Sequence, residues 1–268
     1  KNFSTRNRYI CKMNLIFYKY QGTGNDFVMI DNRTKIFPKQ KTDIISHFCD
    51  RHFGIGADGI ILIENDDLHD FRMIYFNSDG SETFCGNGGR CAVAFAKQLE
   101  IIENNAHFLA FDGEHYATIE NDVISLQMIE VKKITVNKNS VFAFTGTQHH
   151  VEMVENLDEF QVFKKGREIR HQYKNPGSNV NFVQQINENT FRVRTYEKGV
   201  EDETLACGTG VTAVAIAMHK TQKTVSNSII LLVEGGILEV SFEEENGIYK
   251  NVFLKGPAKL VFRGNMII

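Results

Sequence analysis

The sequence predicts an α/β (α+β) protein that consists of two domains of like fold. A Cys-Gly-x-Gly motif occurs twice, each copy runs into one helix-like segment of small and apolar residues, and short strand-like segments make up most of the remainder. The motif cysteines, Cys85 and Cys207, are 122 positions apart (207 − 85), which is a domain-sized period. We therefore expect a tandem pair of domains with the active site in the cleft between them.

The length and composition allow two cores of ordinary size, since 42% of the 268 residues are hydrophobic. We predict an N-terminal extension over residues 1–12, with Met13 as the working start. The extension is basic and lacks the apolar core of a secretory signal. The first domain is expected over 13–128, completed by a returning strand in 257–268, and the second over 129–256.

Charge and cysteine usage exclude several classes of function. The net charge is −3 and no basic stripe with interleaved aromatic residues occurs, so we expect no nucleic-acid partner. No apolar run approaches membrane-spanning length, so we expect no membrane partner. The five cysteines are irregularly spaced and include no Cys-x-x-Cys, which predicts no metal site, no disulfide scaffold and a cytoplasmic location.

The first half begins with a predicted strand at 14–20, which is rich in Ile, Phe and Tyr. A Gly-x-Gly-Asn turn ending at Asn25 interrupts it before a second strand at 28–31. Residues 42–52 form a predicted helix that places Cys49 on its apolar face, and hence in the core. Further strands are predicted at 60–64, 71–76, 107–111, 114–120 and 123–129.

Each half contains one central helix that begins at its Cys-Gly-x-Gly motif, over 86–99 in the first half and 208–220 in the second. Cys91 lies six residues beyond Cys85, about one and two-thirds turns further along, so it is predicted to be a structural residue. The remaining second-half elements are strands at 141–145 and 150–154, a mixed segment at 157–170 with a helical start, a turn at 175–178, and strands at 180–185, 190–196, 228–233, 237–242, 249–254 and 259–262.

A cysteine at a helix N-terminus suits proton transfer. The free N–H groups and partial positive charge there stabilise a thiolate, so we expect the thiol pKa to fall from about 8.5 towards neutrality. A group with a pKa near the working pH is the best general acid or base. The same N–H groups can bind a carboxylate. Two such turns, Cys85 on one side and Cys207 on the other, predict inversion at a carbon next to a carboxylate.

The sequence resembles the diaminopimelate epimerase family from about Met13 to its end. The resemblance rests on three stretches: Gln21-Gly22-Thr23-Gly24-Asn25-Asp26-Phe27; Asn77-Ser78-Asp79-Gly80 with Cys85-Gly86-Asn87-Gly88-Gly89-Arg90-Cys91; and Tyr196-Glu197-Lys198-Gly199 with Glu203-Thr204-Leu205-Ala206-Cys207-Gly208-Thr209-Gly210. It implies two pseudosymmetric domains, each a β-barrel-like mixed sheet around a central helix. It also implies a homodimeric isomerase without a cofactor that interconverts LL- and meso-2,6-diaminopimelate, on the route to lysine and peptidoglycan.

The resemblance also assigns residue roles. Cys85 and Cys207 are the acid and base, exchanging roles with direction, and His149 and Glu197 help to ready the thiols. The residues expected to bind substrate are Asn25, Asn77, Gly86, Asn87, Thr147, Asn179, Glu197, Lys198, Gly208 and Thr209. Their types fit an amino-acid substrate, because amides donate to a carboxylate and accept from an ammonium group.

The sequence departs from the family pattern at several positions. Lys198 stands where an Arg is usual, which replaces a bidentate carboxylate clamp by a point charge. The segment before His149 lacks the usual Pro, and Gly59 stands where many members have Gln. Glu82 precedes Cys85 by three residues, against four for the corresponding Glu in the second copy, and Phe262 stands where some members have a Tyr at the dimer interface.

Three other functions remain open at this point. A proline or hydroxyproline racemase-type enzyme would share the two-cysteine motif, although the set of asparagines with Glu197 and Lys198 favours a substrate with a second amino-acid end. A dithiol redox protein would need a reactive cysteine pair, and no Cys-x-x-Cys is present. A binding protein without activity would not need both motif cysteines.

Overall fold

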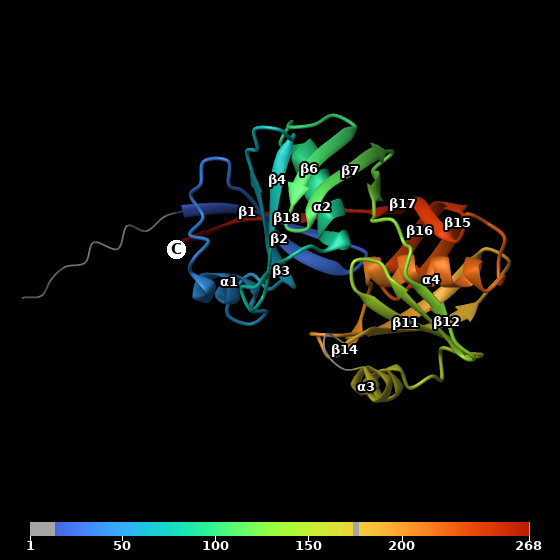
Figure 1. The fold of residues 1–268 in the computed structure, drawn as a ribbon. Helices are drawn as coiled ribbons and strands as arrows, with labels where there is room; N and C mark the ends of the chain where they lie inside the picture. Colours follow the sequence, from blue (N-terminus) through green and yellow to red (C-terminus); the bar gives the residue numbers. More distant parts are fainter. Residues whose placement is uncertain (1–13, 174–176, 268) are drawn as a thin grey trace, which may run out of the picture.

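The computed structural model describes residues 14–173 and 177–267 (Figure 1). The predicted N-terminal extension at residues 1–12, the start at Met13, Cys11 within that extension and part of the predicted turn at 175–178 lie outside the described residues.

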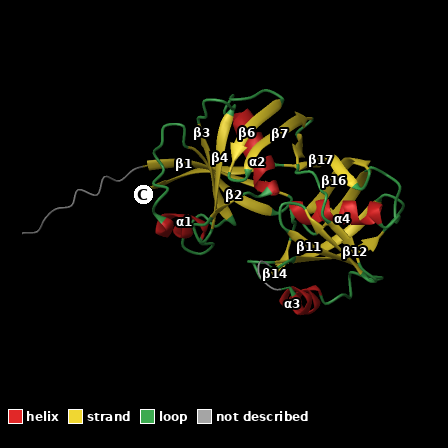
Figure 2. Ribbon diagram, viewed as in Figure 1, coloured by secondary structure: helices red, strands yellow, loops and turns green. Residues whose placement is uncertain are grey.

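In the described residues, 18 strands join in one mixed sheet and four helices pack against it (Figure 2). The elements of the first half are β1 (Asn14–Gly22), β2 (Asn25–Asp31), α1 (Thr42–Cys49), β3 (Gly59–Glu64), β4 (Phe71–Asn77), β5 (Glu82–Thr83), α2 (Gly86–Gln98), β6 (Asn105–Ala110), β7 (Gly113–Glu120) and β8 (Val123–Gln127). The elements that follow are β9 (Ile134–Val136), β10 (Ser140–Phe144), β11 (Gln148–Met153), α3 (Val162–Gln172), β12 (Asn179–Gln185), β13 (Thr190–Glu197), β14 (Asp202–Thr204), α4 (Gly208–Lys220), β15 (Ser228–Val233), β16 (Gly236–Glu245), β17 (Ile248–Pro257) and β18 (Lys259–Ile267).

The two central helices are buried among strands rather than lying on one face of them. Each has 13 residues, of which ten are buried. α2 packs against β1, β2, β3, β4 and β8, and α4 packs in the same way against β10, β11, β12 and β16. A helix that is buried around most of its circumference is stable only inside a protein. The small residues of both helices let the surrounding strands approach, which explains why these segments fold as central helices. The expected fold class of two like domains is confirmed.

The end of the chain returns to its beginning. β18 pairs antiparallel with β1, from Ile267 opposite Asn14 to Lys259 opposite Gln21, and Figure 1 shows the two strands side by side. β17 pairs with β16 on one side and with β8 on the other, so it belongs to both halves of the sheet. This strand therefore connects the surroundings of α2 with those of α4.

The structure confirms most of the predicted elements and corrects some of their ends. α1 ends at Cys49 rather than at residue 52, because Asp50 forms a turn in which its carboxylate accepts hydrogen bonds from the N–H groups of His52 and Phe53. The helical part of the mixed segment is α3. The sequence did not predict β5, β9 and β14, which have only two or three residues each. Cys49 is buried, as predicted, and Cys91, which was predicted to be structural, is buried within α2.

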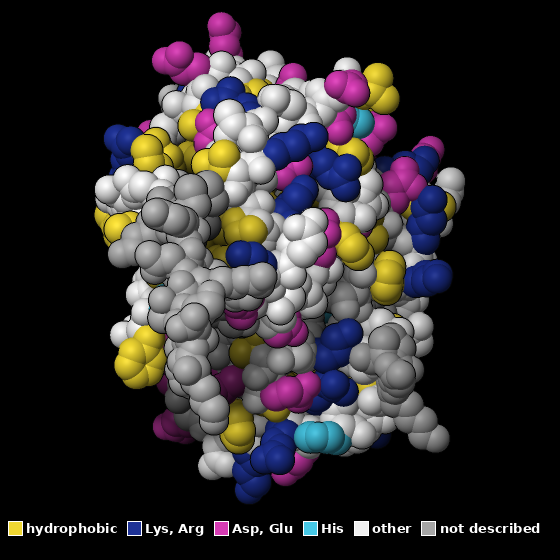
Figure 3. Space-filling view, turned by 90° about the vertical axis from the view of Figure 1, so that its left-hand side faces the viewer, with side chains coloured by type: hydrophobic (Ala, Val, Ile, Leu, Met, Phe, Trp, Pro, Cys, Tyr) yellow, Lys and Arg dark blue, Asp and Glu magenta, His cyan; other side chains and the backbone are white. Residues whose placement is uncertain are grey.

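Within the described residues, no helix is both long and apolar enough to cross a membrane. On the face that Figure 3 shows, Lys and Arg side chains are interspersed with Asp and Glu.

Candidate active site

The N-termini of α2 and α4 meet where the two halves join. Cys85 and Cys207 are the N-cap residues of these helices, and both have an extended backbone. A Cβ added to Gly208 would lie only 3.6 Å from the Gly86 Cα, so the first residues of the two helices lie close together. The Asn87 amide donates to the carbonyl of Ala206 across the junction, at 3.1 Å. Both motif thiols therefore belong to one site.

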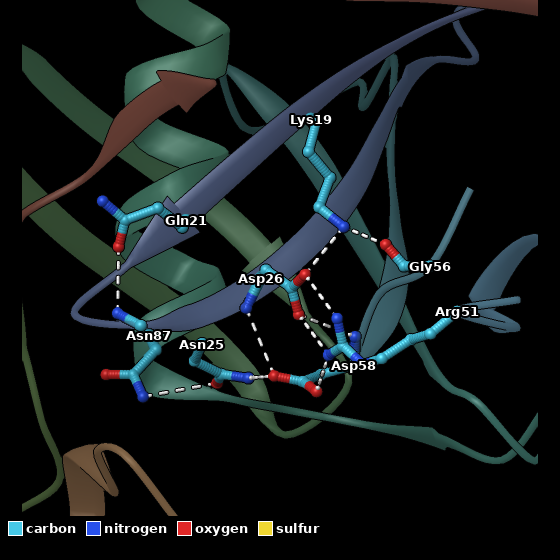
Figure 4. A network of polar contacts seen from close by, with 9 residues as sticks. Lys19, Gln21, Asn25, Asp26, Arg51, Gly56, Asp58 and Asn87 are labelled. Carbon is cyan, nitrogen blue, oxygen red and sulfur yellow. Dashed lines mark hydrogen bonds and ion pairs between the residues drawn. The ribbon is translucent and has the colours of Figure 1, made fainter. Parts of the chain in front are cut away.

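Cys85 faces an amide oxygen. Its Sγ donates to Asn25 Oδ1 at 3.5 Å, and the amide of Asn87 donates to the same oxygen at 3.3 Å. The amide nitrogen of Asn25 donates to the Asp58 carboxylate, so Asn25 is oriented from both ends (Figure 4). The side chain of Asn25, which follows the glycine turn, therefore lies beside the Cys85 thiol.

A network of ion pairs between side chains holds Asp58 in place. Arg51 lies 2.7 Å from both Asp58 and Asp26, and Lys19 lies 2.7 Å from Asp26 (Figure 4). The pKa of Asp26 is lowered to about 2: burial opposes the change, but the hydrogen bonds and charges of Arg51 and Lys19 outweigh it. This network supports Asn25 through Asp58 and was not predicted, because its members come from β1, β2 and the loop after α1.

Cys207 is surrounded mainly by donors. Its Sγ is 3.5 Å from Thr209 Oγ1 and 4.0 Å from the Asn179 amide nitrogen. Thr209 Oγ1 is in turn 3.0 Å from His149 Nε2. His149 is fully buried, and the hydroxyl of Thr209 lies between it and the thiol. The predicted histidine therefore reaches the cysteine through Thr209 rather than directly.

The hydrogen bonds of Asn181 determine which ring nitrogen of His149 carries the proton. The Asn181 Oδ1 accepts from Thr195 Oγ1 at 3.0 Å, and its amide nitrogen donates to the carbonyl of His150 at 3.0 Å and to His149 Nδ1 at 3.1 Å. With Nδ1 accepting, the neutral imidazole carries its proton on Nε2 and donates to Thr209 Oγ1. The Thr209 hydroxyl can then donate to the sulfur of Cys207.

Asn181 is a residue that sequence reasoning missed. It is fully buried on β12, two residues after Asn179, so the two asparagines point to the same face of the strand. A Cβ on Gly210 would lie 2.5 Å from Asn181 Oδ1, which explains the second glycine of the Cys-Gly-x-Gly motif. The Asn-Val-Asn pattern was the signal that could have revealed it.

Glu197 lies at the end of β13, where its carboxylate accepts a hydrogen bond from Thr204 Oγ1 at 3.0 Å. Burial raises the pKa of Glu197, and the Thr204 hydroxyl opposes the change. The charge of Glu197 raises the pKa of both Cys85 and Cys207. One carboxylate therefore acts electrostatically on both thiols.

The predicted fall in thiol pKa is wrong for this arrangement. Burial raises the pKa of Cys85 to about 11, although the N–H groups of Gly88 and Asn87 act in the opposite direction. Burial raises the pKa of Cys207 above its ordinary value as well, against the Thr209 hydroxyl. The helix N-termini stabilise thiolates as expected, but the loss of solvent is the larger effect. Burial, with a further contribution from Lys198, lowers the pKa of His149 to about 3, so this ring is neutral.

The other predicted residues lie at varied positions around the thiols. The Lys198 N–H donates to Asn179 Oδ1 at 2.8 Å, which fixes the amide beside Cys207. Thr147 lies in the turn between β10 and β11, where Thr145 Oγ1 donates to the carbonyl of Thr209 at 2.9 Å. Asn77 instead donates within its own turn, to Ser81 and Thr83. The cysteines described, Cys49, Cys85, Cys91 and Cys207, are free thiols.

The family model and the curated relatives that match this sequence carry the same description. The sequence model of the family described as diaminopimelate epimerase matches residues 17–134 and 141–261. The diaminopimelate epimerase of Flavobacterium psychrophilum is 60% identical over 249 residues, covering 91% of this chain and 97% of that protein. The diaminopimelate epimerase of Aquifex aeolicus is 42% identical over 273 residues, covering 93% of this chain and 97% of that protein.

Solved structures share the fold at low sequence identity. A phenazine biosynthesis protein of the PhzF family from Bacillus anthracis superposes with a TM-score of 0.75 at 13% identity, covering 96% of this chain and all of that one. A hydroxyproline epimerase from Agrobacterium vitis superposes with a TM-score of 0.69 at 13% identity, covering 95% of this chain and 93% of that one. These similarities support the fold alone.

Proposed function

The chain belongs to the diaminopimelate epimerase family, and from this premise we propose that it interconverts LL- and meso-2,6-diaminopimelate by a two-thiol mechanism. The chain is thus an isomerase, serving the supply of diaminopimelate and lysine. The observation that carries the proposal is the meeting of two N-cap cysteines, Cys85 and Cys207, where the two halves join. A substrate carbon placed between them would have one sulfur on each side.

In the proposed reaction, one sulfur acts as a thiolate and removes the α-proton of the substrate. The C–H bond breaks, and its electron pair delocalises into the neighbouring carboxylate. The other sulfur, as a thiol, gives its proton to the opposite face of the same carbon. We propose that the N–H groups at Gly86-Asn87 and Gly208-Thr209 bind that carboxylate and stabilise the charge that develops on it. In the reverse direction, Cys85 and Cys207 exchange roles.

The surroundings of the two thiols favour different protonation states for Cys85 and Cys207. The Asn25 oxygen accepts from Cys85, which favours the protonated thiol. Thr209 and Asn179 can donate to Cys207, which favours a thiolate there. We assign His149 the role of holding the Thr209 hydroxyl in its donating orientation. Glu197, whose pKa is raised by burial, can take up the proton released when a thiol ionises.

The buried oxygen of Asn87 supports an amino-acid substrate. Among the described residues, no donor reaches Asn87 Oδ1, although the atom is buried. A buried acceptor without a partner is costly, and a substrate ammonium group would satisfy it. We propose that Asn87, Asn25 and Asn179 bind the polar groups at the reacting end. We propose Asn77, Thr147 and Lys198 as binding residues further from the reacting carbon.

A homodimer is proposed from the resemblance, and the edge of the sheet supports it. Leu260, Val261 and Phe262 on β18 are about half exposed, as is Ile16 on the neighbouring strand β1. Exposed apolar side chains grouped on adjacent strands are typical of a contact surface. Light scattering of the purified protein tests this proposal, and a monomer at micromolar concentration would contradict it. The cytoplasm is the proposed location, from the family's biosynthetic role.

Proton NMR in D₂O tests the proposed function. The reduced protein is incubated with LL-diaminopimelate in one tube and with L-proline in another. Loss of the α-proton signal and appearance of the meso isomer in the first tube alone is the expected result. Exchange with proline alone would keep the chemistry but support the racemase alternative, whose fold relatives include the hydroxyproline epimerase. No exchange in either tube, with both motif thiols reduced, would overturn the proposal.

A further inference from the structure

We propose that His69, His107 and Glu114 form a binding site for a divalent transition-metal ion, with Zn²⁺ as the expected ion. His69 lies in the loop between β3 and β4, His107 on β6 and Glu114 on β7. The cluster thus belongs to the β6–β7 hairpin rather than to the junction of α2 and α4, and it has no part in the proposed reaction.

The spacing of the donor atoms suits a single ion. His107 Nε2 is 3.1 Å from Glu114 Oε2, and His69 Nε2 is 3.5 Å from Glu114 Oε1. All three donor groups lie within 4.8 Å of one another. A tetrahedral Zn²⁺ site has Zn–N and Zn–O distances of roughly 2.0–2.2 Å, which places neighbouring donors about 3.3 Å apart. Small side-chain rotations would bring the three groups to those positions, leaving the fourth for water.

A carboxylate orients His69 as in known metal sites. Asp66 Oδ1 is 2.6 Å from His69 Nδ1, so the Nδ1 proton is directed at Asp66 and the Nε2 lone pair is free for a metal. The side chain of His69 is only 7% exposed and that of Asp66 15%, so neither is a mobile surface group. Asp66 is itself held by the N–H groups of Leu68 and His69, both at 3.1 Å.

The second histidine is also fixed in orientation. The ring of His107 stacks on Tyr116, with centroids 4.2 Å apart and an interplanar angle of 10°. Its backbone N–H donates to Asp70 at 2.7 Å, which ties β6 to the loop that carries His69. Both metal-binding rings are therefore positioned before an ion arrives, which lowers the ordering cost of binding.

The two histidines lie close together around one carboxylate. The imidazole rings of His69 and His107 have centroids 4.6 Å apart, and both rings reach Glu114. One metal ion would bind both rings together with Glu114.

The sequence predicts no metal site, since that expectation came from the spacing of the cysteines. The three ligands are 38 and 7 residues apart (107 − 69 and 114 − 107), and no short motif contains them. Strand pairing brings them together, with β6 antiparallel to β7 and the end of the β3–β4 loop beside β6. The ion would join the loop to the hairpin and stabilise the first half of the molecule.

The test uses the full chain, reduced and stripped with EDTA, with Cys85 and Cys207 replaced by Ser in every sample to prevent thiolate binding. Zn²⁺ is titrated by calorimetry, and Co²⁺ is used as a spectroscopic probe. One equivalent should bind, the Co²⁺ form should show tetrahedral visible bands, and saturating Zn²⁺ should raise the Tm by roughly 5 °C. His69→Ala and Glu114→Gln should abolish stoichiometric binding, and Asp66→Asn should weaken it roughly 10–100-fold.

The matched control is His52→Ala, which removes an exposed histidine outside the cluster and should bind like the parent protein. Equal binding by the parent and His69→Ala proteins would place the ion elsewhere and overturn the proposal. So would an absence of saturable binding up to roughly 1 mM Zn²⁺. Because binding and melting are the readouts, failure of this proposal is distinguishable from failure of the proposed epimerase reaction.

Discussion

Replacing Thr209 by Val should slow epimerisation while leaving the fold intact. Valine has nearly the shape of threonine but lacks the hydroxyl that lies 3.0 Å from His149 Nε2 and 3.5 Å from the sulfur of Cys207. A hydrogen bond to a charged group is worth about 1.5–3 kcal/mol. Its loss from the Cys207 thiolate should lower kcat about 10- to 150-fold, at one factor of ten for each 1.4 kcal/mol. The backbone N–H that we assign to carboxylate binding is unchanged, so KM should change little.

The assay is α-proton exchange in D₂O, followed by NMR as a function of substrate concentration and pH. The weaker thiolate should also move the limb of the kcat profile that reports the Cys207 thiol to higher pH, by about one to two units. Thr209→Ser restores the hydroxyl and should recover most of the rate. Val also leaves the buried Nε2–H of His149 without its partner, so urea unfolding should show a loss of about 1–3 kcal/mol.

Two results would refute this reasoning. A kcat within twofold of the parent value in a folded Thr209→Val protein would mean that the hydroxyl does not assist Cys207. A second check combines the variant with His149→Asn. If both residues act through one chain of hydrogen bonds, the double variant should lose about as much as the worse single variant. Losses in kcat that multiply would show that His149 acts on the reaction independently of Thr209.

Further predictions concern the thiols and their immediate neighbours. Either Cys85→Ala or Cys207→Ala should abolish epimerisation of diaminopimelate, and turnover in either variant would mean that one thiol is enough. Gly210→Ala should destabilise the protein by about 1–3 kcal/mol in urea unfolding, because its Cβ would lie 2.5 Å from Asn181 Oδ1; unchanged stability would show that the site yields easily. Lys198→Arg should lower KM, since a guanidinium can bind a carboxylate in two places, and an unchanged KM would remove this residue from the binding set. Alkylation by iodoacetamide should accelerate as the pH approaches about 11, since burial raises the pKa of Cys85 to that value; a plateau reached near neutral pH would contradict the raised pKa.

The features that could be predicted from the sequence are those that depend on local pattern. The Ala-rich segments after Cys85 and Cys207 fold as helices that begin where the motif predicts, because glycine turns and apolar periodicity act over a few residues. The assignment of Cys49 to the core follows from the apolar periodicity of its helix. This prediction needed no knowledge of distant contacts, only of the face on which Cys49 lies.

The features that could not be predicted depend on contacts between distant segments. Asn181 reaches His149 across 32 residues, and Asp58 reaches Asn25 across 33. The sequence also predicted the wrong direction for the pKa shift of the two motif thiols, for the same reason. A helix N-terminus is visible in a sequence, whereas the burial that outweighs it depends on how the two halves close over Cys85 and Cys207.

The two halves carry equivalent helices on one polypeptide, and this covalent fusion has a chemical consequence. A symmetric pair of identical short chains would place the same neighbours around both sulfurs, so neither could be set apart as donor or acceptor. In this single chain the two copies differ: Cys85 faces the oxygen of Asn25, whereas Cys207 faces the hydroxyl of Thr209. Each sulfur can therefore be tuned by substitutions that leave the other untouched. A single chain with two like halves can therefore give the two thiols of the proposed mechanism unequal surroundings.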